Sequence, residues 1–183
     1  MLVIIISVIF GILLIWMIAI YNNLIFLNNN LSKAFSNIDV MLKQQFDEIP
    51  KLIEVCKGFM QHEKELLTRL TELRTQFLNA QSLEEKVDTE NQFVRALKSI
   101  FAVSENYPEL RSSETFLQLQ RRISDLQERI ADRREYYNEA VALYNSRLQS
   151  FPDILIAKAF NFKSGVFLEI PQDQTQDVKI SFT

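Results

Sequence analysis

The stretch that decides the fold is LIFLNNNLSKAFSNIDVMLKQQFDEIPKLIEVCKGFM, residues 24–60. Its apolar residues recur at steps of three and four, which is the spacing of one face of an α-helix. The members of this stripe are Leu24, Leu27, Leu31, Phe35, Ile38, Leu42, Phe46, Ile49, Ile53, Cys56 and Met60. The stripe keeps its phase through Pro50. The pattern therefore predicts either one long helix kinked near Pro50 or two helices that abut there in register.

The residues before this stretch, MLVIIISVIFGILLIWMIAI, contain no charged side chain. As a helix they would measure about 30 Å, the thickness of the hydrocarbon core of a bilayer. No Lys or Arg precedes the run, and bulky Trp16, Met17 and Ile18 stand where a cleaved secretory signal would carry small residues. The pattern favours an uncleaved transmembrane anchor over residues 1–21 rather than a cleaved signal.

The charges around the apolar run indicate its orientation. No lysine or arginine precedes the run, and three lysines follow it: Lys33, Lys43 and Lys51. Positive charge beside a span tends to stay on the cytoplasmic side. We therefore expect the soluble part of the chain to lie in the cytoplasm.

Three further helical stripes follow, over residues 66–77, 87–101 and 116–148. Ser82 and Glu85 have the spacing of a capping box, which predicts a helix start there. The last stripe stops before Pro152. Because each stripe needs a partner to bury it, the sequence predicts a bundle of helices.

The predicted fold class is all-α, with an N-terminal transmembrane helix that continues into an antiparallel bundle of about four helices. The bundle spans residues 22–151, and the tail over 152–183 holds a short helix near 153–160 followed by an extended end. Eight residues are expected in the core of the bundle: Leu42, Phe46, Ile49, Leu70, Leu97, Ile123, Leu126 and Ile130.

The composition argues against several classes of function. The net charge of −3 disfavours a nucleic-acid binder, which normally presents a basic face. A single Cys excludes an internal disulfide framework, and one Cys with one His makes a zinc site improbable. We expect no cofactor, no metal and no nucleic-acid partner.

The segment EIPKLIEVCKGFMQHE, residues 48–63, holds the only cysteine and the only histidine. Cys56 falls on the apolar stripe, so packing as a small hydrophobe is favoured over a reactive thiol. His62 and Glu63 follow a helix end and do not form the HExxH pattern of zinc proteases. No phosphate loop, serine elbow or carboxylate pair is recognisable, so we expect no catalytic residues and no enzyme.

Polar residues interrupt or flank the stripe of the last long helix. Arg133 stands at a position of the stripe that should be apolar, and Asn138 and Asn145 lie one heptad apart beside it. These residues form a predicted polar network whose members are Asp39, Arg133, Arg134, Asn138 and Asn145. The network either fixes the helix register or lines a membrane-proximal pocket for a partner or a lipid headgroup.

The proposed contacts of this network depend on the direction of the helices. If the first and last long helices are antiparallel, Arg133 or Arg134 lies near Asp39. The same arrangement places Asn138 near Ser36 and Asn37.

The tail is the best candidate for a binding element, because it is too apolar for a solvated end. The residues that make it so are Phe160, Phe162, Val166, Phe167 and Ile170. These residues either fold back on the bundle or dock onto a neighbouring subunit or another protein.

Two long stretches resemble the LemA family. They are YNNLIFLNNNLSKAFSNIDVMLKQQFDEIPKLIEVCKGFMQHE, from residue 21, and LKSIFAVSENYPELRSSETFLQLQRRISDLQERIADRREYYNEAVALYNSRLQSFPDILIAKAFNF, from residue 97. Phe35 stands where the family often has Trp, and Cys56 where it often has Thr or another small residue. The resemblance implies a small bacterial inner-membrane protein with one span and an antiparallel helical bundle.

The resemblance names no biochemical activity, because none is established for the family in general. One member is needed for the formation of magnetosome membranes, and LemA genes can lie beside a gene for a membrane zinc metalloprotease. Two functions are therefore expected: a self-assembling scaffold that organises membrane proteins or membrane shape, or an adaptor of a metalloprotease in envelope stress or quality control. An enzyme is the third alternative, with no motif in its favour.

Overall fold

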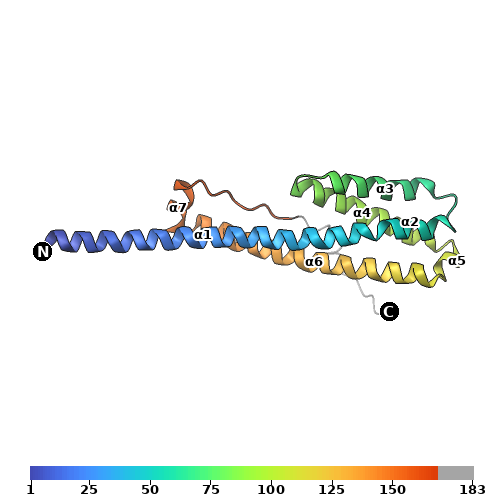
Figure 1. Cartoon of the computed structure of the whole chain (residues 1–183), viewed down its shortest axis with the longest axis horizontal. Helices are drawn as coiled ribbons and strands as arrows, with labels where there is room; N and C mark the ends of the chain where they lie inside the picture. Colours follow the sequence, from blue (N-terminus) through green and yellow to red (C-terminus); the bar gives the residue numbers. More distant parts are fainter. Residues whose placement is uncertain (169–183) are drawn as a thin grey trace, which may run out of the picture. The chain divides into compact units, whose positions relative to one another are not determined.

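The computed structural model describes residues 1–168, and this part is helical with no strand (Figure 1). The all-α class predicted from the sequence is confirmed. The helices of the described residues are α1 (Leu2–Asp47), α2 (Ile49–Lys57), α3 (Lys64–Asn79), α4 (Leu83–Ser104), α5 (Pro108–Arg111), α6 (Glu114–Gln149) and α7 (Asp153–Ala159).

The described chain divides into two compact units, and each is presented by itself. The first, called here the anchor unit, comprises residues 1–38 and 133–168. The second, called the bundle unit, comprises residues 39–132. Helices α1 and α6 each contribute residues to both units. The division expected at residues 21 and 151 remains a prediction.

The end of α1 shows how the stripe keeps its phase through Pro50. Helix α1 ends at Asp47 and α2 begins at Ile49, with Glu48 between them still in a helical backbone conformation. Pro50 occupies the first turn of α2, where a missing N–H breaks no helical hydrogen bond. The structure therefore matches the second alternative, two abutting helices in register, and both Ile49 and Cys56 are buried.

Aromatic side chains form the centre of the bundle unit. Phe46 of α1 stacks on Phe77 of α3 with 4.2 Å between ring centroids, and its ring also lies 4.6 Å from that of Phe93 in α4. Phe101 meets Phe116 edge-on at the start of α6. Aromatic pairs of this kind stabilise a core beyond the area that they bury.

Helices α3 and α4 pack against each other as an antiparallel hairpin (Figure 1). The predicted capping box is confirmed at the start of α4. Glu85 N–H donates to the Ser82 hydroxyl, and the Glu85 carboxylate accepts from the N–H groups of Gln81 and Ser82. These backbone hydrogen bonds, that from Gln81 first, lower the pKa of Glu85. The capping box of Ser82 and Glu85 thus fixes the residue at which α4 begins after the turn from α3.

All eight residues expected in the core are buried. The stripe of α6 differs from the expectation at Arg133. Arg133 is exposed, and Arg134 is the buried residue, with 4% of its surface accessible. From Ile130, steps of three and four residues both stay on one helix face. In the structure, the buried residue that follows Ile130 lies four positions later, at Arg134.

In the anchor unit, α1 and α6 run antiparallel (Figure 1). The ring of Phe35 in α1 contacts that of Tyr137 in α6, with centroids 6.4 Å apart. Leu31, one turn earlier on α1, and Val141, one turn later on α6, both lie against Gly165. The predicted pairing of the first and last long helices is therefore confirmed within this unit.

The start of α1 packs against no other described element. Its large apolar residues from Leu2 to Ile18 are exposed, and burial begins at Ile20 and Leu24. Among residues 1–168, the helix that starts at Leu2 is the one long and apolar enough to cross a membrane. The short helix expected near residues 153–160 is present as α7.

We expect Leu126→Ala to lower the free energy of unfolding by about 2–5 kcal/mol, because the side chain is buried in α6 and its removal leaves a cavity. Leu78→Ala, at a position that is 56% exposed in α3, is the matched control and should change it by less than about 0.5 kcal/mol. Urea unfolding of the full chain in mild detergent measures both. Equal small effects would contradict the assignment of Leu126 to the core.

Candidate functional site

The two asparagines on α6 hold the segment that follows α7. Asn145 donates from Nδ2 to the carbonyl of Gly165 at 2.9 Å and accepts from the N–H of Gly165 at 2.8 Å. Asn138 makes the same pair of bonds with Leu168, both at 2.9 Å. Each side-chain amide thus satisfies both main-chain groups of one residue, as a partner strand does in a β-ladder. We call these four hydrogen bonds the main-chain clamp.

The spacing of the clamp follows from the geometry of the two elements. Asn138 and Asn145 are one heptad apart, which is about 10.5 Å along a helix. Gly165 and Leu168 are three residues apart, and a chain covers at most about 3.3–3.6 Å per residue. The segment is therefore nearly fully extended between its two attachment points. A helical tail could not reach both asparagines.

Two further contacts seat this segment. The Tyr137 hydroxyl donates to the carbonyl of Val166 at 3.1 Å, and burial raises the pKa of Tyr137, which keeps the phenol a donor. A Cβ on Gly165 would lie 3.2 Å from Cδ1 of Leu31. A side chain at position 165 would require Leu31 to shift by a few tenths of an ångström, so the segment approaches α1 closely at this glycine.

The tail residues predicted to bind fall into two groups, one packed against α1 and one exposed. Phe160 and Phe162 contact the ring of Tyr21 in α1, with centroids 4.7 and 5.8 Å away. Val166 and Phe167 are 71% and 53% exposed, although their neighbour Leu168 is buried. Ile170 lies outside the described residues. The described part of the tail therefore folds back on its own chain, the first of the two alternatives.

Asp39, the acidic member of the predicted network, has two lysine partners in the bundle unit. One carboxylate oxygen lies 2.6 Å from Nζ of Lys86 on α4, and the other lies 2.7 Å from Nζ of Lys43. Burial would raise the pKa of Asp39, but the hydrogen bonds and charges of Lys43 and Lys86 outweigh it and lower that pKa. The ion pair of Asp39 with Lys86 therefore joins α1 to α4.

The structure gives the other network residues different roles. Asn138 bonds to Leu168 rather than to Ser36 or Asn37, and the Ser36 hydroxyl donates to the carbonyl of Ser32. A pairing of Asp39 with Arg133 or Arg134 would join the two units, and it stays a prediction. Of the five predicted members, Asn138 and Asn145 act on the same element, because both bind the tail.

The bundle unit also buries polar groups that the sequence did not single out. Glu48 is 3% exposed and pairs with Lys51 and with Arg122 of α6, each at 3.1 Å. Gln45 is fully buried, and its amide atoms have no hydrogen-bond partner among the described residues. The residues seven positions away from Gln45 and Glu48 are apolar. A buried helix face wide enough to include these positions would have predicted that both side chains are buried.

Cys56 is buried as expected from its place on the stripe, and burial raises the pKa of its thiol to about 11. The thiol is therefore protonated near neutral pH. His62 lines an open hollow of about 740 Å³ beside Lys57, Lys64 and Met60. Within residues 1–168, no three side chains of His, Cys, Asp or Glu are grouped to hold a metal ion.

Together these features define a class: an all-helical chain whose first helix is apolar enough to cross a membrane. The LemA family model matches residues 34–182, so the chain belongs to the LemA family. The chain is also similar to Protein LemA of Metamycoplasma hominis. The two are 21% identical over 154 residues, which cover 84% of this chain and 70% of that protein.

We expect the Asp39–Lys86 pair to stabilise the bundle unit by about 1–3 kcal/mol, because both side chains are less than one-fifth exposed. A double-mutant cycle of Asp39→Ala and Lys86→Ala measures this coupling by urea unfolding. The matched cycle with Lys43, which is 57% exposed, should give about 0–1 kcal/mol. Equal coupling in both cycles would contradict the partly buried contact.

The pH dependence of the same pair has a defined sign. Because the folded-state pKa of Asp39 is lowered, its contribution is complete above the unfolded pKa of about 3.9 and is lost as pH falls through the lower, folded value. The difference in stability between the wild type and Asp39→Asn should therefore shrink below about pH 4. A difference that stays constant to pH 2 would contradict the assignment.

We expect Asn145→Asp to release the segment 163–168. The carboxylate loses the donor to the Gly165 carbonyl and repels that oxygen, a loss of about 0.5–1.5 kcal/mol or more. Hydrogen exchange of this segment should become roughly three- to tenfold faster. Asn29→Asp, at an exposed position of α1, is the control and should leave exchange unchanged. Unchanged exchange in Asn145→Asp would exclude the clamp.

Proposed function

We propose that the protein is a membrane-anchored, non-enzymatic scaffold that assembles with copies of itself. The observation that carries the proposal is the main-chain clamp of Asn138 and Asn145. A site that binds main-chain atoms can be filled by any segment that fits its spacing, in the way that strand addition works at a sheet edge. The segment available in every neighbouring copy is residues 163–168.

Exchange of this segment between copies keeps every hydrogen bond of the clamp. The contacts of one chain with its own tail would be replaced by identical contacts with the tail of a neighbour, as in a domain swap. Val166 and Phe167, which are exposed in the single chain, are then carried to the surface of the neighbouring copy. These two side chains are available within the exchanged segment to add new contacts.

The anchor favours such an exchange. If residues 1–21 span the bacterial inner membrane, all copies share one orientation and the same height above the bilayer. The clamp of one chain then lies at the same height as the tail of the next, which raises the effective concentration of the exchanged segment. Free chains in solution lack this advantage, so assembly should depend on the membrane.

Complementation between two defective chains tests the exchange. The first, Asn138→Leu with Asn145→Leu, keeps its tail but lacks the clamp, and the second, truncated after Phe162, keeps the clamp but lacks the tail. Each carries its own affinity tag, and the chains to be compared are produced together in one membrane before extraction in mild detergent. The wild type should capture itself, each defective chain should fail to do so, and the mixture should restore capture. Asn28→Leu with Asn29→Leu, both exposed on α1, is the matched control.

Each result of this experiment has a distinct meaning. Self-capture by the wild type without restoration in the mixture would overturn the exchange and place assembly on another surface. A wild type that does not capture itself would contradict the scaffold. Co-purification of a membrane zinc metalloprotease in its place would favour the adaptor function that the family's gene neighbourhood suggests.

A further inference from the structure

Three large apolar side chains are exposed around α7 of the anchor unit. Phe151 is 80% exposed, Leu155 is 59% exposed and Phe160 is 58% exposed. Large apolar side chains exposed within one short segment can mark an interaction site. The position of this segment along the apolar helix α1 indicates what it contacts.

The contact of the tail with Tyr21 fixes that position. The rings of Phe160 and Phe162 lie against Tyr21, three residues beyond Ile18, the last member of the exposed apolar run. Ile20 is the first residue of α1 that the rest of the unit buries. Helix α7 therefore lies beside the point where α1 would leave the bilayer (Figure 1).

The length of the apolar run places the membrane surface at the same level. Residues 2–18 form a helix of about 25 Å, which is short of the hydrocarbon thickness of about 30 Å. About three more residues complete the span, and they bring the boundary to Tyr21. Asn22 and Asn23 follow directly, and their polar side chains stop the hydrocarbon from reaching further. The boundary and the Phe160 contact thus coincide.

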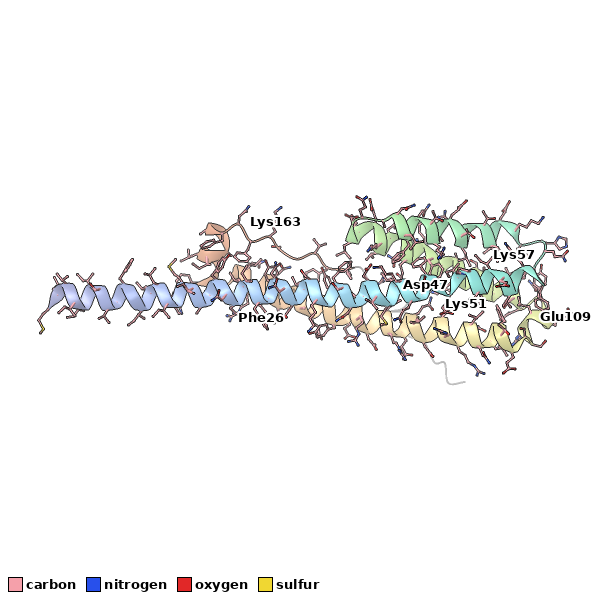
Figure 2. The ribbon with its side chains drawn as sticks, in the orientation of Figure 1. Phe26, Asp47, Lys51, Lys57, Glu109 and Lys163 are labelled. Atoms are coloured by element: carbon pink, nitrogen blue, oxygen red, sulfur yellow. The ribbon has the colours of Figure 1, made fainter. Side chains whose placement is uncertain are left out.

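The charges around α7 suit an anionic surface. Lys158 and Lys163 are exposed, and Figure 2 shows Lys163 on the side of α1 away from Phe26. The one acidic residue of α7, Asp153, is buried and paired with Arg147 at 3.5 Å. Lysines near a membrane surface attract anionic headgroups, and their long stems allow apolar neighbours to enter the bilayer boundary.

We propose that α7 and its flanking residues are a second membrane contact that lies in the headgroup region. Phe151, Leu155 and Phe160 enter the boundary with the acyl chains, and Lys158 and Lys163 bind anionic lipid phosphates. The proposal rests on the anchor of the proposed function. It adds that the α6–α7 corner is held on the bilayer and that the tail leaves for the clamp from the membrane surface.

Spin labels at three positions of the full chain test the proposal. Leu155→Cys reports on α7, Ile12→Cys reports on the anchor, and Tyr136→Cys is the control. Tyr136 is 56% exposed on α6, about 20 Å of helix before Gln149. Cys56 is replaced by Ala in all three, and one chain is placed in each nanodisc of phosphatidylcholine and phosphatidylglycerol. Accessibility to oxygen and to a water-soluble nickel complex then gives the depth of each label.

The expected result is a deep Ile12 label, a Leu155 label at the level of the headgroups or acyl boundary, and a Tyr136 label in water. A Leu155 label as exposed to water as the Tyr136 label, beside a deep Ile12 label, would overturn the proposal while the anchor stands. This is the result expected if the apolar patch instead serves another protein. An Ile12 label in water would overturn the anchor and the proposal together.

Charge reversal tests the choice of lipid. Lys158→Glu with Lys163→Glu should move the Leu155 label outward in the anionic nanodisc and should change its depth less in pure phosphatidylcholine. Lys33→Glu with Arg133→Glu makes the same charge change at two exposed positions of the unit and should leave the depth unchanged. Equal depths for both variants in the anionic disc would exclude the role of the two lysines.

Discussion

Helix α1 presents two different surfaces along one backbone, and the packing of the described residues follows from this constraint. From Leu2 to Ile18 its apolar side chains point outward in all directions, which is stable where lipid surrounds the helix. From Ile20 onward the apolar residues narrow to one stripe, which other helices cover. Phe77 of α3 and Phe93 of α4 cover Phe46 of that stripe, and Tyr137 of α6 contacts Phe35.

The polar groups of the described chain are used mainly to position helices and the tail. Asp39 ties α1 to α4 through Lys86, and Glu48 ties the α1–α2 junction to α6 through Arg122. Asn138 and Asn145 each donate one hydrogen bond to a main-chain carbonyl of the tail and accept one from a main-chain N–H group. This use of polar side chains is the physical reason to propose a protein that binds other chains, because the clamp recognises main-chain atoms.

Periodicity and capping predicted the fold, and residue type alone predicted part of the site. Pro50 within the stripe located the α1–α2 junction, and Ser82 with Glu85 located the start of α4. Asn138 and Asn145 stood out as amides on a helix face, but their partners are main-chain groups in a tail that has no periodicity to place it. Arg133 and Arg134 could not be separated, because both continue a helical step from Ile130.

The proposed scaffold and the proposed membrane contact of α7 both depend on α1 being retained as a membrane anchor. Membranes that contain the protein can be washed with alkaline carbonate, and the mass of the intact chain in the resistant fraction can then be measured. The account predicts a membrane-retained chain of about 21.4 kDa that still contains residues 1–20. A shorter chain that begins near Tyr21 and is released by carbonate would contradict it.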